Sequence, residues 1–200
     1  MEEDLLVSLE VDQPIWDRVF TVAPLVVIGT REGEGFDLAP KHMAAPMSWG
    51  NYFGFVCGPS HGTYGNAREH GCFTVSYPRP EQVAVTSLTA TRRQDGPGDE
   101  KPVLRDLRTH PATHVDGVFL SGAYLMLECE LHQVVDGLGD NSLIIGRIVA
   151  AHAREEALRL TDADHQEAIN TAPLLAFVQP GRYAVITETM AFPLPSDFSR

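Results

Sequence analysis

Two long runs of residues with high strand propensity, 124–135 and 142–152, follow each other closely in the second half of the chain. The six residues that separate them, 136–141, include two glycines, an asparagine and two aspartates. Runs rich in valine, isoleucine and tyrosine are typical of strands, and a short Gly-rich link joins such strands as a hairpin. We therefore expect an antiparallel sheet built around this hairpin.

Shorter runs of the same kind predict further strands at 25–30, 52–57 and 73–76. Short helices are expected at 15–20, 63–70, 81–88 and 164–170. The polar, Gly-rich segment 92–101 is expected to be a surface loop. Five or more strands with short helices between them favour a mainly β fold, an antiparallel β-barrel with helical additions.

The composition restricts the kind of partner. A length of 200 residues fits one domain, 1–200, and a formal net charge of −12 argues against a surface for nucleic acid or an anionic membrane. The chain starts with an acidic Met1-Glu2-Glu3-Asp4, and no apolar run reaches membrane-spanning length. Three cysteines without a CxxC pair favour a reducing compartment. We expect a cytoplasmic protein with no nucleic-acid or membrane partner.

The segment 57–66, Cys-Gly-Pro-Ser-His-Gly-Thr-Tyr-Gly-Asn, joins a predicted strand to a predicted helix. Thr63 suits the N-cap position, and Gly71 suits the stop. A helix start rich in glycine and hydroxyl groups offers unpaired N–H groups and the positive end of the helix dipole, which together favour a phosphate. The same residues also fit a capped surface helix that binds nothing.

The order of the motifs resembles the flavin reductase-like family, the FMN-binding split barrels. That family has a Pro-led apolar strand ending in threonine, an Asn-Leu-Ala-Pro segment, a Thr-x-x-Asn helix start and a Phe-x-Val strand. Its later elements include a Leu-Glu-Cys strand and a closing Gly-x-Tyr. The matching segments of this chain are 24–30, 37–40, 63–66, 73–75, 127–129 and 181–183. Asp37 stands where the family usually has asparagine, and Lys41-His42-Met43 replaces a serine and aromatic segment.

The resemblance implies a flavin-dependent oxidoreductase of the NAD(P)H:flavin reductase type on an antiparallel FMN-binding split barrel. It implies FMN as cofactor, with FAD as the alternative, NAD(P)H as hydride donor, and a downstream acceptor such as a partner oxygenase. It also implies a homodimer and no catalytic side chain. Ser60, His61, Thr63 and Asn66 would hold the phosphate or ribityl chain. Thr30, Ala39, Pro40, Lys41 and His42 would line the ring.

Three other interpretations remain open. The same motifs fit a flavin-binding electron carrier without NAD(P)H activity. Residues 58–62 match the G-x-S-x-G elbow of a serine hydrolase with Ser60 as nucleophile, although too few strands precede it for that fold. A barrel that has lost its flavin and serves as a binding module is the third. The pair His110 and His114 has metal-ligand spacing, but Pro111 and the lack of a nearby acidic pattern favour a loop.

Overall fold

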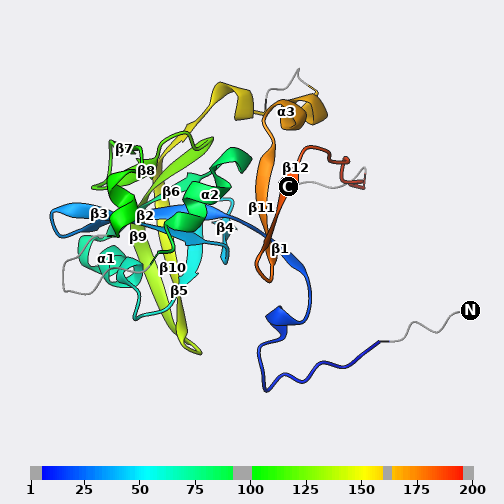
Figure 1. Ribbon diagram of the computed structural model, residues 1–200, viewed down its shortest axis with the longest axis horizontal. Helices are drawn as coiled ribbons and strands as arrows, with labels where there is room; N and C mark the ends of the chain where they lie inside the picture. The colour runs from blue at the N-terminus through cyan, green and yellow to red at the C-terminus, as the bar shows by residue number, and fades with distance from the viewer. Residues whose placement is uncertain (1–5, 92–100, 160–163, 196–200) are drawn as a thin grey trace, which may run out of the picture.

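The computed structural model describes residues 6–91, 101–159 and 164–195 (Figure 1). The expected loop at 92–101 therefore lies outside the described residues except for Lys101. The fold is centred on a seven-stranded sheet with the strand order β3-β2-β6-β9-β10-β5-β4, in which every neighbouring pair is antiparallel. Its strands are β2 (Val26–Glu32), β3 (Gly35–Lys41), β4 (Ala44–Ser48), β5 (Tyr52–Cys57), β6 (Cys72–Tyr77), β9 (Leu125–Leu138) and β10 (Asn141–Ala153).

Two smaller sheets and three short α-helices complete the described fold. A three-stranded sheet contains β1 (Thr21–Pro24), β11 (Leu174–Gln179) and β12 (Arg182–Ile186), and a two-stranded sheet contains β7 (Thr109–Pro111) and β8 (Val118–Leu120). The α-helices are α1 (Gly62–His70), α2 (Val83–Leu88) and α3 (His165–Thr171). Short 3-10 helices lie at Ile15–Asp17, Pro80–Gln82, Pro102–Arg105 and Glu155–Ala157. In Figure 1 the orange β11–β12 hairpin stands beside the main sheet, on the side away from α1.

The predicted hairpin forms the longest strand pair of the structure. Strands β9 and β10 pair from Leu138↔Asn141 to Leu125↔Ala153, so the strands continue through most of the segment expected as a turn. Gly137 and Gly139 have φ angles of 85° and 61°, a region that costs glycine little, and this lets the chain reverse tightly. The hairpin prediction is confirmed, with a shorter turn than expected.

The edge strands were harder to recognise. The sequence predicted no strand between residues 31 and 51, yet this part of the chain contains both β3 and β4. Each contains a proline, Pro40 or Pro46, which argues against a central strand. Both strands lie at the ends of the sheet order, where a missing N–H need not break the ladder.

The helix predictions at 63–70, 81–88 and 164–170 agree with the structure within one or two residues, with Pro80–Gln82 forming a 3-10 turn ahead of α2. The helix expected at 15–20 is only the 3-10 turn Ile15–Asp17, none of whose residues is buried. A six-residue helix without a packed face has too few hydrogen bonds to offset its nucleation cost.

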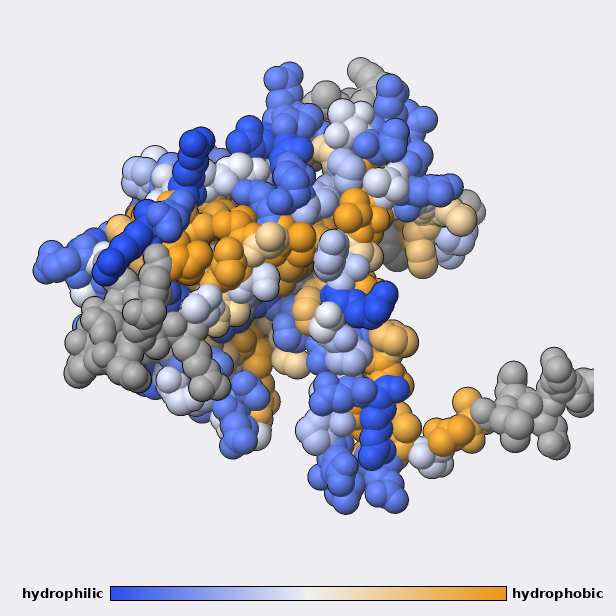
Figure 2. Space-filling view, viewed as in Figure 1, coloured by the Kyte–Doolittle hydropathy of each residue, from blue (hydrophilic) through white to orange (hydrophobic). Residues whose placement is uncertain are grey.

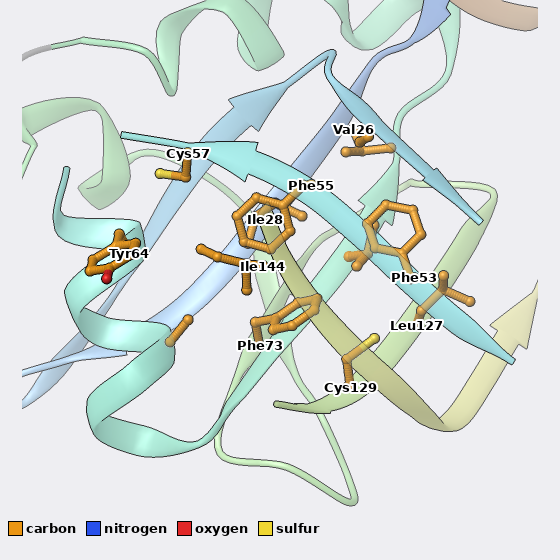
Figure 3. Close-up of a cluster of buried hydrophobic side chains, with 13 residues drawn as sticks. Val26, Ile28, Phe53, Phe55, Cys57, Tyr64, Phe73, Leu127, Cys129 and Ile144 are labelled. Atoms are coloured by element: carbon orange, nitrogen blue, oxygen red, sulfur yellow. The ribbon is translucent and has the colours of Figure 1, made fainter. Parts of the chain in front are cut away.

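The main hydrophobic core lies between the sheet and α1 (Figure 3). Phe55 and Phe73 meet edge to face with ring centroids 5.1 Å apart, and Tyr64 and Ala67 bring α1 onto the same cluster. A Cβ at Gly146 would lie 2.5 Å from Cζ of Phe73, so β10 can cross this ring only with glycine at that position. The packing fixes where α1 begins, which matters for the site described next. Within the described residues no helix is long and apolar enough to cross a membrane.

Candidate functional site

A cavity of about 600 Å³ lies between β3, the start of α1 and the segment that follows α2. Its lining combines apolar residues with hydroxyl, imidazole and charged side chains. The lining residues are Asp37, Ala39, Pro40, Lys41, Ser60, His61, Gly62, Thr63, Thr89, Ala90, Thr91 and Lys101. The structure therefore brings together six residues proposed from the sequence: Ala39, Pro40, Lys41, Ser60, His61 and Thr63.

The two lysines of the sequence, Lys41 and Lys101, both line this cavity. Lys101 is 8% exposed, and its Nζ lies 2.8 Å from Oδ1 of Asp37. The same ammonium donates to the carbonyl oxygens of Leu38 and Thr89, each at 2.9 Å. An ammonium has three donors, so Lys101 uses all of them to join β3 to the end of α2. Its role is to build the wall of the cavity.

Lys41 is differently placed. Its Nζ donates to Sγ of Cys57 at 3.4 Å, and Nδ1 of His61 lies 3.8 Å from the same sulfur. A thiol is a weak acceptor, so the Lys41 ammonium keeps donors for an anion in the cavity. Because Asp37 is paired with Lys101, Lys41 gives the cavity a net positive charge.

The start of α1 adds backbone donors to the same cavity. His61 occupies the N-cap position expected for Thr63, and its side chain makes no capping hydrogen bond. The first helical bond runs from the N–H of Tyr64 to the carbonyl of His61, so the N–H groups of Gly62 and Thr63 precede the helical ladder. No acidic residue lies in the first turn. These N–H groups and the helix dipole favour an anion beside Lys41.

Three of the residues proposed from the sequence do not line this cavity. The amide of Asn66 donates to Oγ1 of Thr30 and to Oε1 of Glu32, both at 3.2 Å, and thereby ties α1 to β2. Thr30 is 1% exposed. The ring of His42 stacks on Phe177 with centroids 4.4 Å apart and lines a second cavity. Direct flavin contact by these three residues stays a prediction.

A second set of contacts holds α1 against the β9–β10 hairpin. The hydroxyl of Tyr64 donates to Oδ1 of Asp136 at 3.0 Å, and Arg68 donates to that hydroxyl at 2.6 Å. Ser142 donates to the same carboxylate oxygen at 2.6 Å. The hydrogen bonds from Ser142 and Tyr64 lower the pKa of Asp136. The helix start is thus positioned by the central hairpin as well as by the core.

The sequence reasoning missed Lys101 and the segment 89–91 as parts of the cavity. A signal for Lys101 was present, because a chain with a net charge of −12 has lysine at only two positions. The hydrolase interpretation gains no support, since within the described ranges Ser60 makes no hydrogen bond to a histidine. The adjacent His61 instead faces Cys57.

The comparison with protein families decides the identity of the fold. Residues 19–175 match the flavin reductase like domain. The protein belongs to the flavin reductase-like family. This agrees with the resemblance seen in the sequence between about Pro24 and Tyr183. A search of curated proteins finds no significant match.

Solved structures show the same fold. An FMN-binding protein from Thermus thermophilus, solved with bound 1-cyclohex-2-enone, shares 22% identity at a TM-score of 0.75, with 93% of this chain and 99% of that chain covered. A flavin reductase candidate with a split barrel domain from Shewanella frigidimarina shares 17% sequence identity at a TM-score of 0.73, with 87% of each chain covered. Nitrilotriacetate monooxygenase component B from Mycobacterium thermoresistibile shares 15% sequence identity at a TM-score of 0.69, with 90% of this chain and 89% of that chain covered. The flavin reductase-like family member therefore has the expected split-barrel fold.

Proposed function

We propose that this protein binds FMN, with the phosphate between Lys41 and the start of α1, and acts as a flavin-dependent oxidoreductase. The observation that carries the proposal is the placement of Lys41, whose charge no acidic residue of the cavity neutralises, beside the N–H groups at the start of α1. A cavity of about 600 Å³ lies within the range of roughly 300–1,000 Å³ that small-molecule sites occupy. That size suits a mononucleotide, which favours FMN over the larger FAD.

The apolar side chains of Ala39 and Pro40 give the same cavity a wall for the flavin ring. When bound, the flavin supplies the transfer of electrons from NAD(P)H to an acceptor, while the protein supplies position and electrostatics. One solved structure with this fold is named as the component B of a monooxygenase, which supports an oxygenase as the downstream partner. Steady-state oxidation of NADH and NADPH with added FMN distinguishes this reductase from an electron carrier without such activity.

Replacement of Lys41 by methionine is expected to weaken FMN binding about 10- to 100-fold, because hydrogen bonds from a charged donor contribute roughly 1.5–3 kcal/mol. Quenching of flavin fluorescence during titration measures the affinity. Arg147→Met is the matched control, since Arg147 pairs with Glu130 on the surface and does not line the cavity. An FMN affinity of the Lys41 variant equal to that of the native protein would show that the phosphate does not bind beside Lys41.

We also propose that the functional unit is a homodimer. Large apolar side chains are exposed on the segment before β1, including Leu6 at 95%, Val11 at 85% and Phe20 at 74%. Figures 1 and 2 show that this segment projects from the body of the molecule with orange side chains exposed. Near the other end, Met190 and Phe192 are 93% and 79% exposed. Apolar surface of this extent usually marks an interface, and twofold symmetry is the commonest way to cover it.

Light scattering at micromolar concentration is expected to give about twice the chain mass of 21.9 kDa. Phe20→Asp should shift the protein toward the monomer, since a carboxylate at an apolar interface carries a desolvation cost. Glu10→Asp, on the same exposed segment, serves as the control. A monomer at all concentrations that retains FMN would refute the dimer.

A further inference from the structure

A lysine, a cysteine and a histidine meet at the edge of the proposed flavin cavity. Nζ of Lys41 lies 3.4 Å from Sγ of Cys57, and Nδ1 of His61 lies 3.8 Å from the same sulfur. Lys41 is the last residue of β3 and Cys57 is the last residue of β5, two strands near opposite ends of the sheet order. The closure of the barrel therefore brings a primary amine, a thiol and an imidazole together.

The sulfur of Cys57 contacts two side chains that line the cavity without lining it itself. Cys57 is 2% exposed, whereas Lys41 is half-buried and His61 is exposed. A lysine side chain has a flexible stem, so its movement opens the sulfur to a molecule as small as hydrogen peroxide. A bulky thiol has no such access. The position thus suits a small oxidant rather than disulfide exchange.

The other two cysteines have less reactive surroundings. Burial and the neighbouring Glu128 carboxylate raise the pKa of Cys129 to about 12. Burial also raises the pKa of Cys72, whose thiol donates to the carbonyl of Asp116 at 3.7 Å. The thiolate is the form that reacts with oxidants, so both of these cysteines react slowly. Cys57 instead lies beside an ammonium group and beside an imidazole that can accept the thiol proton.

We propose that Lys41 and Cys57 form an oxidative modification site, at which hydrogen peroxide joins Nζ to Sγ through one oxygen atom. One inserted oxygen spans more of the 3.4 Å between nitrogen and sulfur than a direct S–N bond does. The product is a covalent N–O–S cross-link between the ends of β3 and β5. Its formation needs only the residues of this cluster and the peroxide.

The reaction balances with peroxide as the oxidant. The first peroxide molecule converts the Cys57 thiol to a sulfenic acid, as an S–O bond forms, the O–O bond breaks and water leaves. A second peroxide molecule displaces the sulfenic hydroxyl as water and leaves an S–O–OH group. The Lys41 amine, after giving one ammonium proton to solvent, attacks the sulfur-bound oxygen, and the O–O bond breaks with release of a third water. Sulfur and nitrogen are oxidised, and peroxide is reduced to water.

The cross-link removes the positive charge of Lys41 from the cavity. FMN affinity should therefore fall about 10- to 100-fold, as expected for Lys41→Met. This consequence rests on the proposed function, whereas the cross-link itself does not. A reductase built in this way is switched off by peroxide and switched on again by a thiol reductant.

The test treats the full chain with hydrogen peroxide in the absence of flavin, blocks free thiols with iodoacetamide and digests the denatured protein with trypsin. Trypsin does not cleave after a modified lysine, so residues 32–68 should remain one peptide with Cys57 unalkylated. Its mass should exceed that of the unmodified peptide by about 14 Da, through gain of one oxygen and loss of two hydrogens. Dithiothreitol should restore both cleavage after Lys41 and alkylation of Cys57. Sulfoxides at Met43 and Met47 do not respond to dithiothreitol, which separates them from the cross-link.

Variants assign the cross-link to this pair of side chains. Lys41→Arg, which keeps a cation but has no primary amine, and Cys57→Ser should each abolish it, whereas the control Cys72→Ser should form it as the native protein does. Peroxide should weaken FMN binding by the native protein and by Cys72→Ser, but not by Cys57→Ser. Full cleavage after Lys41 in peroxide-treated native protein, or oxidation that stops at a sulfenic or sulfinic acid of Cys57, would overturn the inference. A cross-link that leaves FMN affinity unchanged would instead contradict the phosphate position, so the two proposals can fail separately.

Discussion

Replacing Lys101 by methionine is expected to lower the free energy of unfolding by about 3–5 kcal/mol, the usual cost of removing one partner from a buried ion pair. Lys101 is 8% exposed and Asp37 is 2% exposed, and their charged atoms lie 2.8 Å apart. The substitution leaves the Asp37 carboxylate without this ion pair and leaves the carbonyls of Leu38 and Thr89 without the lysine donor. Urea unfolding followed by circular dichroism measures the loss.

The double variant Lys101→Met, Asp37→Asn tests whether the unpaired Asp37 carboxylate causes the loss of stability. It should lose less stability than Lys101→Met alone, because no buried carboxylate remains to be neutralised. The surface pair Arg147 and Glu130 gives the matched comparison, with both side chains more than half exposed. Arg147→Met is expected to cost less than about 1 kcal/mol. A Lys101 variant as stable as this surface variant would contradict the buried ion pair.

The second large effect concerns Glu128, a carboxylate of β9 with no exposed surface. It accepts hydrogen bonds from the backbone N–H groups of Thr113, His114 and Val115, and from the Thr113 hydroxyl at 2.9 Å. Nε2 of His152 lies 3.2 Å from Oε1. One buried carboxylate therefore holds the loop after β7 against the central hairpin.

These contacts make stability depend on pH. Burial alone would raise the pKa of Glu128, but the hydrogen bonds from Thr113, His114 and His152 together lower the pKa from 4.5 to about 2. Because the folded-state value lies below the unfolded one, the stabilisation is complete above about pH 5 and is lost as the pH falls toward 2. This lowering of the Glu128 pKa corresponds to about 3 kcal/mol of stability at neutral pH.

Glu128→Gln should therefore flatten the dependence of unfolding free energy on pH between about 5 and 2. It should also lower stability at neutral pH, where the ionised acceptor makes its strongest bonds. Glu130→Gln, on the same strand but with the side chain 54% exposed, should leave the pH profile nearly unchanged. Identical profiles for the Glu128 variant and the native protein would show that this carboxylate does not control acid unfolding.

The sequence predicted the parts of the fold whose signals are local. The hairpin of β9 and β10 and the strand at Tyr52–Cys57 are rich in aromatic and β-branched residues, so their patterns needed no tertiary information. Strands β3 and β4 did need it, because each contains a proline that is tolerated only at the edge of a sheet. Position in the sheet is a property of the whole fold, which a local pattern does not report.

The candidate site was predictable to a similar degree. Residues near one another in sequence, such as Ser60, His61 and Thr63, were found from the pattern of a helix start. Lys101 reaches the cavity from a position 64 residues after Asp37, and only tertiary packing joins them. Asn66 matches the family motif, but its side-chain amide donates to Thr30 and Glu32. In this structure the motif residue therefore positions α1 against β2.

The central claim is that Lys41 and the start of α1 hold the phosphate of FMN. The most direct measurement compares the affinities of the native protein for FMN and for riboflavin, which share the ring and ribityl chain and differ in the phosphate. Charge-assisted hydrogen bonds to that phosphate predict at least about tenfold tighter binding of FMN. The difference should shrink in the Lys41→Met variant. Equal affinities of the native protein for the two flavins would contradict the account.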